Sequence, residues 1–208
     1  MKVKDKKLKR IIGGISAALV VAQVVLVLMS WLLSALQIEG VRSLLSSEGV
    51  RWFCGNFASF VASPALVWLL LMAMAVGGID HSGLLLLLRT PRSLRNYRQK
   101  LALRITVFAF MAYAAVVLAL AIAPHAVLLS ATGGLFPSPF SSALVPIVAF
   151  GLLLLSVLCG VAIGRYSRPS HVVGALSSGI AKAAPLFIIY ILAIQFFQSL
   201  TFVFFTLF

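Results

Sequence analysis

The longest run without a charged residue constrains this chain more than any other feature. Between Arg104 and Arg165 the sequence contains no Lys, Arg, Asp or Glu. A helix needs roughly 20 apolar residues to cross a hydrocarbon core of about 30 Å, so this run has room for two membrane-spanning helices. Turn-forming residues lie in its middle and separate the two spans. They are Pro124, His125, Gly133, Gly134, Pro137 and Pro139.

Three more apolar stretches bring the expected number of spans to five. Residues 53–79 are uncharged, but Pro64 interrupts them. We therefore expect a sloping or interfacial helix before Pro64 and a span after it. Pro185 falls in the first turn of the last expected span, where its missing N–H costs little. The five spans are expected at about residues 11–36, 64–79, 105–123, 143–164 and 183–207.

The composition is that of a chain solvated mostly by lipid. Hydrophobic residues make up 62% of it and charged residues 10%, whereas about 25% of the residues in a soluble domain are charged. Long continuous apolar runs favour helices over the short alternating segments of a membrane β-barrel. The expected fold is an all-α integral membrane protein in which residues 1–208 form one polytopic domain.

The basic residues lie in alternate loops, and this pattern orients the spans. The chain has 17 Lys and Arg against 4 Asp and Glu, a net charge of +13. The tail at 1–10 and the second and fourth loops are strongly basic, whereas the third loop and the C-terminal end carry no charge. The fourth loop is expected to hold Arg165, Arg168 and Lys182. Basic loops stay in the cytoplasm, so we expect the N-terminus inside and the C-terminus outside. Because the charge reports topology, we expect no binding to nucleic acid.

The sequence offers little material for catalysis or metal binding. It has three His, two Cys and four acidic residues, and it lacks CxxC and HExxH motifs. Cys54 and Cys159 are expected near opposite faces of the bilayer, too far apart for a disulfide. No nucleophile and base are visible as a set, so we expect neither an enzyme nor a bound cofactor.

An ionisable pair, Asp80-His81, lies where the second span is expected to leave the membrane, inside the segment 77–83 with its three glycines. Such a pair at a broken helix can form an ion or proton site. The alternative is a solvated break that ends the span. The central parts of the expected spans contain no acid, Lys or Arg, which argues against a proton relay.

Small and amide side chains within the spans indicate helix packing. Gly160 and Gly164 form a GxxxG pattern, and Gln195 and Gln198 lie one turn apart in the last span. Small side chains let helices approach closely in lipid, and amides hydrogen-bond across helices. We interpret these residues as sites of internal packing or of association, with a polar pathway as the alternative for the amides. Related features are Gln23, the alanines Ala115, Ala119 and Ala123, and the pair Ala73 and Gly77.

Arginines recur at every third position after the second span. One interpretation is an amphipathic cytoplasmic helix that lies on anionic lipid headgroups. The other is a basic loop that is simply retained in the cytoplasm. The arginines are Arg89, Arg92, Arg95 and Arg98, and Leu94, Tyr97 and Leu101 lie among them.

Several short segments occur in an order that matches one family of membrane proteins. They are residues 43–52, 56–57, 64, 74–84, 90–92, 133–140, 164–166, 172–179 and 193–196. Taken together, this ordered set resembles the aminobenzoyl-glutamate transporter family of bacterial membrane proteins. The resemblance implies a bacterial inner-membrane protein related to inverted-repeat transporters, whose re-entrant hairpins and broken helices form a sodium and substrate site.

The chain differs from that family in length. The first hairpin is expected between Arg89 and Lys100, where the sequence has a short basic linker, and the second is expected after Phe208. The resemblance is therefore to the inner, dimer-forming scaffold helices of the family. It makes Asp80, His81 and Asn56 the candidates for residues that line a pathway or bind an ion.

Three functions are compatible with these observations. The first is a transporter-derived membrane scaffold or accessory subunit, without transport of its own, that forms a homodimer or docks onto another integral membrane protein. The second is a minimal transporter for a small anion similar to aminobenzoyl-glutamate. The third is a structural subunit of an envelope machine. The short linker and the uncharged spans favour the first.

The expected orientation can be tested with reporters fused after Phe208. Alkaline phosphatase should be active there and green fluorescent protein dark, because the alternating basic loops place this end outside the cytoplasm. A fluorescent fusion combined with an inactive phosphatase fusion would contradict the orientation.

Overall fold

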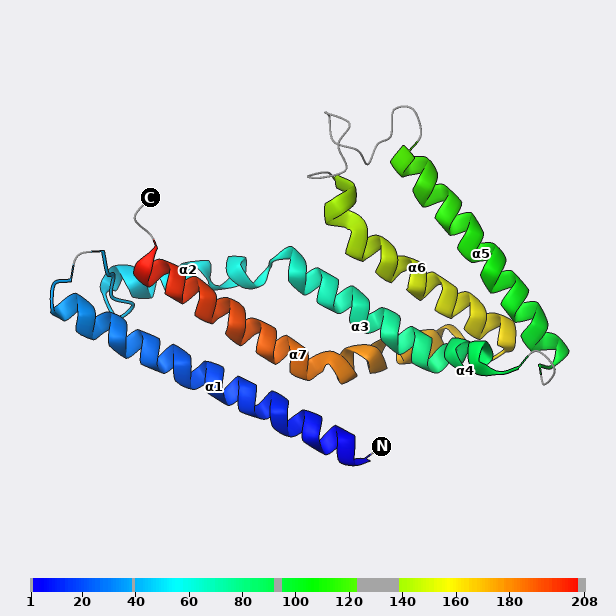
Figure 1. The fold of residues 1–208 in the computed structure, drawn as a ribbon, viewed down its shortest axis with the longest axis horizontal. Coiled ribbons are helices and arrows are strands. Elements are labelled where there is room, and N and C mark those ends of the chain that lie inside the picture. Colours follow the sequence, from blue (N-terminus) through cyan, green and yellow to red (C-terminus); the bar gives the residue numbers. More distant parts are fainter. Residues whose placement is uncertain (1, 39, 92–94, 123–138, 206–208) are drawn as a thin grey trace. The chain divides into compact units, whose positions relative to one another are not determined.

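The computed structural model describes residues 2–38, 40–91, 95–122 and 139–205. Helices account for 87% of the structure, and the described residues contain no strand. The expected all-α fold is confirmed. The helices are α1 (Lys2–Ala35), α2 (Ser47–Val61), α3 (Pro64–Ser82), α4 (Leu84–Arg89), α5 (Tyr97–Ile122), α6 (Pro139–Ile163) and α7 (Pro169–Phe204) (Figure 1).

Five of these helices are long and apolar enough to cross a membrane. The number agrees with the five spans expected from the sequence. The helices α2 and α4, with 15 and 6 residues, are too short to count among them. The candidate spans are Arg10–Ala35, Pro64–Ser82, Tyr97–Ala121, Ala143–Ile163 and Pro169–Phe204. The turn-forming residues expected between the third and fourth spans lie mainly at 123–138, outside the described residues.

Proline and serine explain where the second span begins. The side chain of Ser46 accepts a hydrogen bond of 3.0 Å from the backbone N–H of Gly49 and so caps α2. That helix ends at Val61, and α3 starts at Pro64, where the missing N–H of proline is tolerated. The uncharged stretch is thus two helices, as the position of Pro64 predicts.

The last helix differs from the expectation. The fifth span was expected to begin near residue 183, with Pro185 in its first turn, but α7 begins at Pro169 and Pro185 lies in its interior. Pro185 cannot donate a backbone hydrogen bond to Ala181, so it removes one bond from the middle of the helix. Lys182, expected in a loop, lies within the helix one turn before this proline.

The structure divides into two compact units. The terminal unit comprises Met1–Leu66 and Ala184–Phe208, and the central unit comprises Val67–Ala183. Helices α3 and α7 contribute residues to both, and the division within α7 falls next to Pro185. Whether residues 1–208 fold as the single polytopic domain expected from the sequence stays a prediction.

A stacked pair of aromatic rings lies within the apolar core of the terminal unit. The rings of Trp52 on α2 and Phe202 on α7 are stacked with centroids 4.3 Å apart. Leu26, Leu44 and Val203 are buried beside them. This core joins α1, α2 and the C-terminal part of α7 with the segment between α1 and α2, and Figure 1 shows these helices in blue, cyan and red.

Polar contacts in the terminal unit join helices that are far apart in sequence. The Nε2 of Gln23 on α1 donates a hydrogen bond of 2.9 Å to the hydroxyl of Ser199 on α7. The hydroxyl of Tyr190 on α7 donates to the carbonyl of Val61 at 3.0 Å and contacts the Ser63 hydroxyl at 2.6 Å. Gln23 therefore acts as the sequence suggested, as an amide that bonds across helices.

In the central unit α5 and α6 pack side by side and antiparallel (Figure 1). The hydroxyl of Thr106, near the start of α5, donates to the carbonyl of Ala102 at 2.8 Å within the same helix. Farther along α5, the hydroxyl of Tyr113 donates to the carbonyl of Ile147 at 2.7 Å. The ring of Tyr113 lies on Gly151, where a Cβ would fall 2.7 Å from a ring carbon. A glycine is therefore needed for the ring to reach α6.

Glycines also bring α3 and α7 together in the central unit. A Cβ placed on Gly77 would lie 2.6 Å from the Cα of Gly179 and 2.5 Å from the carbonyl oxygen of Ala175. Real Cβ atoms essentially never come this close to backbone, so the two helices can approach this far only because both positions lack a side chain. The Ala73 and Gly77 pair noted in the sequence lies at this contact, since Gly179 also faces the Ala73 carbonyl.

This contact predicts opposite effects for two alanine substitutions in α7. Gly179→Ala should destabilise the protein by about 1–3 kcal/mol because the new methyl group overpacks against the backbone of Gly77. Gly174→Ala is the matched control, because a Cβ there meets nothing within 4 Å, and it should be neutral or stabilise α7 by up to about 1 kcal/mol. Thermal unfolding in detergent measures both, and equal melting temperatures for the two variants would contradict the packing.

Candidate functional site

The candidate site lies at the end of α3 in the central unit. It combines three segments: the α3 terminus with Asp80 and His81, the turn between α6 and α7, and the part of α7 that carries Lys182. The Gly77 and Gly179 contact described above fixes the first and third of these segments beside each other.

Asp80 forms an ion pair with Lys182. Lys182 Nζ lies 2.6 Å from Asp80 Oδ2, and the two side chains are 57% and 37% exposed. An ion pair with this much exposure contributes about 0–1 kcal/mol to stability. It nevertheless places a cation of α7 against the acid at the end of α3 and offsets its charge.

His81 is held by hydrogen bonds within the same unit. Its Nδ1 lies 3.1 Å from the carbonyl oxygen of Gly77 and 3.2 Å from the hydroxyl of Ser178. The Ser178 hydroxyl donates its hydrogen to the carbonyl of Ala175 at 2.7 Å. A carbonyl only accepts hydrogen bonds, so Nδ1 carries a hydrogen, which it donates to Gly77 and Ser178.

The turn between α6 and α7 delivers Arg165 and Tyr166 to the end of α3. Helix α6 ends at Ile163, and Gly164 takes a positive φ of 87°. The backbone N–H groups of Arg165 and Tyr166 then donate to the carbonyl of Gly160 at 2.8 and 3.1 Å. Such a left-handed glycine after a helix satisfies the last carbonyls and turns the chain back.

Tyr166 locks this turn onto α3. Its ring packs on Gly160, where a Cβ would lie 3.1 Å from the ring carbon Cγ. Its hydroxyl donates to the carbonyl of Gly78 at 3.2 Å. Burial raises the pKa of the Tyr166 phenol, and the Arg165 guanidinium opposes this by lowering it. A raised pKa keeps the phenol protonated, so it remains a donor to Gly78.

Arg165 reaches the backbone at the junction of α3 and α4. Its guanidinium donates to the carbonyl of His81 at 3.3 Å. It also lies against Gly83, where a Cβ would be only 2.8 Å from the guanidinium carbon. Gly83 has a φ of 79°, a conformation that favours glycine, and α4 begins directly after it.

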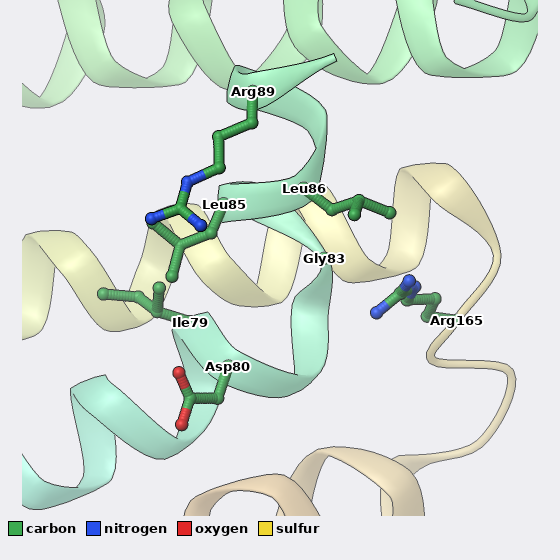
Figure 2. A pocket seen from close by; sticks show the side chains of 7 residues that line it. All are labelled: Ile79, Asp80, Gly83, Leu85, Leu86, Arg89 and Arg165. Carbon is green, nitrogen blue, oxygen red and sulfur yellow. The ribbon is translucent and has the colours of Figure 1, made fainter. Parts of the chain in front are cut away.

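Arg165, Gly83 and Asp80 border a cavity of about 290 Å³. Figure 2 shows Arg89 reaching back from the end of α4 over Leu85 toward Ile79, while Arg165 enters from the opposite side toward Gly83. The carboxylate of Asp80 points away from Arg165. The lining residues are Ile79, Asp80, Gly83, Leu85, Leu86, Arg89 and Arg165.

The remaining residues expected in a pathway or at a headgroup are Asn56, Arg92, Arg95 and Arg98. Asn56 belongs to the terminal unit, where its side-chain amide donates to the carbonyl of Trp52 one turn back on α2. Arg92 falls outside the described residues. Arg95 precedes α5 and donates from Nε to the carbonyl of Thr90 at 3.0 Å, and Arg98 is exposed in the first turn of α5.

The arginine series does not form the single amphipathic helix that its spacing suggested. Arg89 ends α4, and α5 begins only at Tyr97. Thr90 and Pro91 separate them, with Thr90 extended at the end of α4, and a proline cannot supply the backbone N–H that a continuous helix needs. Arg89 and Arg98 therefore belong to different helices.

The four residues expected to pack helices have separate local roles. Gly160 is covered by Tyr166, and Gly164 lies beyond the end of α6, so the GxxxG pair does not form one open face of a helix. Gln195 is buried in the terminal unit, and neither polar atom of its amide has a hydrogen-bond partner among the described residues. Gln198 is partly buried. A role of these residues in association stays a prediction.

Sequence reasoning treated Arg165 and Lys182 as loop charges and did not single out Ser178 or Gly179. The sequence does contain a signal for Gly179 and Lys182. Gly179 lies four residues after Ala175, as Gly77 lies four after Ala73, and a charged residue follows each glycine by three positions. Two such patterns of opposite charge predict a close helix contact with an ion pair beside it.

Among the described residues, no three His, Cys, Asp or Glu side chains gather in a group that could hold a metal ion.

Comparison with protein-family models, with curated proteins and with solved structures found no match.

Proposed function

We propose that this protein is a multi-pass membrane scaffold that acts by associating with a second copy or with another integral membrane protein. In this proposal it resides in the bacterial inner membrane with its N-terminus in the cytoplasm, and it moves no solute by itself. The resemblance to the scaffold helices of the aminobenzoyl-glutamate transporter family is part of the same proposal.

The main observation behind this proposal is the ion pair between Asp80 and Lys182. Asp80 lies in the glycine-rich segment 77–83, where the second span was expected to end, and no other acid lies in that segment. Its carboxylate is paired with Lys182 at 2.6 Å. The neighbouring His81 is bonded to Gly77 and Ser178. Both residues have partners on α7, Lys182 and Ser178, so they link α3 to α7.

The exposed faces of α1 and α5 supply room for association. In these spans only 6% and 11% of the most apolar window is buried, the lowest values among the five. Ala115 and Ala119 lie one turn apart on α5 and are both exposed. Since small residues permit close backbone approach in lipid, we propose this face of α5 as the seam. Ala123, the third residue of that series, lies outside the described residues.

Counting copies in lipid vesicles tests the proposal. Single-molecule photobleaching of labelled protein should show two copies for the wild type and mostly one for Ala115→Leu with Ala119→Leu, because leucines separate the helix backbones. The control Val116→Leu with Leu120→Phe adds bulk at exposed neighbours on the same helix and should leave the count unchanged. A wild type that stays single at every protein-to-lipid ratio would contradict self-association.

The same vesicles test the absence of transport. Labelled p-aminobenzoyl-glutamate should not enter them faster than it enters protein-free vesicles, with or without a sodium gradient. Sodium-dependent uptake that Asp80→Asn abolishes would overturn the scaffold proposal.

A small-anion transporter is the second candidate, and one observation favours it. The cavity beside Gly83 has two arginines in its lining, so it offers positive charge to an anion. In that case uptake would depend on Arg89 and Arg165 as well as on Asp80, which distinguishes it from the scaffold in the vesicle experiment.

A further inference from the structure

The cavity beside Gly83 has two guanidinium groups without acidic partners. Among the residues that the structure describes, neither Arg89 nor Arg165 lies within ion-pair distance of a carboxylate. Asp80, which lines the same cavity, is paired with Lys182. Arg165 spends one donor on the His81 carbonyl. A guanidinium has five N–H donors, so both arginines retain donors for an anion.

The backbone around the cavity is shaped to hold Arg165 in place. Gly83 takes a positive φ and leaves space for the guanidinium, which a side chain at this position would occupy. Tyr166, the next residue, is anchored on Gly160 and Gly78. Arg165 is therefore preorganised, which reduces the entropy lost when it binds a ligand.

The cavity lies where two candidate spans end. One span ends at Ser82 and another at Ile163, so Gly83 follows the first directly and Arg165 follows the second by two positions. In a bilayer this is the level of the lipid headgroups, which flank the hydrocarbon core. An anion at this depth sits where phospholipid phosphates are concentrated.

Apolar side chains complete the lining. Leu85 and Leu86 on α4 are 45% and 59% exposed, and Ile79 lies beside them. The arginines and leucines together match a molecule with a phosphate at one end and hydrocarbon at the other. A free phosphate would gain nothing from the leucines.

We propose that this cavity binds the phosphate of an anionic phospholipid, with Arg89 and Arg165 donating to the phosphate oxygens and Leu85 and Leu86 contacting the glycerol and first acyl carbons. Planar guanidinium groups suit phosphate oxygens because they present two parallel donors. This inference does not depend on the scaffold function, because a bound lipid is compatible with a scaffold or a transporter.

Native mass spectrometry of the full chain with defined lipid tests the site. Protein from micelles supplemented with phosphatidylglycerol should retain one lipid tightly, and phosphatidylcholine, which carries no net charge, should bind at least tenfold more weakly. Arg89→Gln with Arg165→Gln should weaken phosphatidylglycerol binding at least tenfold, since two charge-assisted hydrogen-bonding groups are lost.

The matched control removes the same charge elsewhere. Lys7→Gln with Arg10→Gln changes two exposed cations on α1, in the terminal unit, and should leave phosphatidylglycerol binding within about twofold of the wild type. An equal loss in both double variants would mean that overall charge alone attracts the lipid, and this result would overturn the proposal.

A conservative pair covers the case in which the glutamine variant fails to fold. Arg89→Lys with Arg165→Lys keeps both charges but loses the planar fork. It should bind phosphatidylglycerol several-fold more weakly than the wild type, and unchanged binding would contradict the assigned geometry.

A second arm separates the lipid from a free anion. Inorganic phosphate and glycerol 3-phosphate should compete for the site only weakly, because they lack the apolar part. Binding of either one as tight as that of phosphatidylglycerol, with the same dependence on Arg89 and Arg165, would assign the cavity to a soluble phosphate and refute the lipid proposal.

Discussion

The arrangement of the central unit depends on one close backbone contact, between Gly77 on α3 and Gly179 on α7. A Cβ on Gly77 would lie 2.6 Å from the Cα of Gly179, so any larger residue would push the helices apart. Lipid tails are as apolar as leucine, so helices in a bilayer gain little from hiding apolar surface and depend on such packing and on hydrogen bonds. The Asp80–Lys182 ion pair and the His81–Ser178 contact both lie beside this approach.

The sequence was sufficient to predict the helices that depend on hydrophobic length. The uncharged runs gave five spans, and Pro64 marked the start of α3. The start of α7 and the break between α4 and α5 could not be predicted from the length of the apolar runs. Pro185 suggested the start of a helix because prolines are common in the first turn. However, α7 begins at Pro169 and contains Pro185 in its interior despite the missing hydrogen bond. The arginine series suggested one helix, but Pro91 stands between α4 and α5.

The site was predicted only in part. Asp80 and His81 stood out because ionisable residues are rare near a span, and the structure places them at the centre of a polar cluster. Their partners were missed because Arg165 and Lys182 lie 85 and 102 positions from Asp80 and were explained by topology alone. The two glycines of the GxxxG pattern have local roles that the pattern did not predict. Its second glycine is the left-handed residue that ends α6, and its first makes room for Tyr166.

Cross-linking within one chain tests the glycine contact most directly. His81→Cys with Ser178→Cys, in a background of Cys54→Ser and Cys159→Ala, should react in membranes with a short bifunctional thiol reagent, because the wild-type side chains lie 3.2 Å apart. Adding Gly179→Leu should abolish the intramolecular product, whereas Gly174→Leu should not, since a Cβ at Gly174 meets nothing within 4 Å. A cross-link that survives Gly179→Leu, or that never forms, would contradict the account.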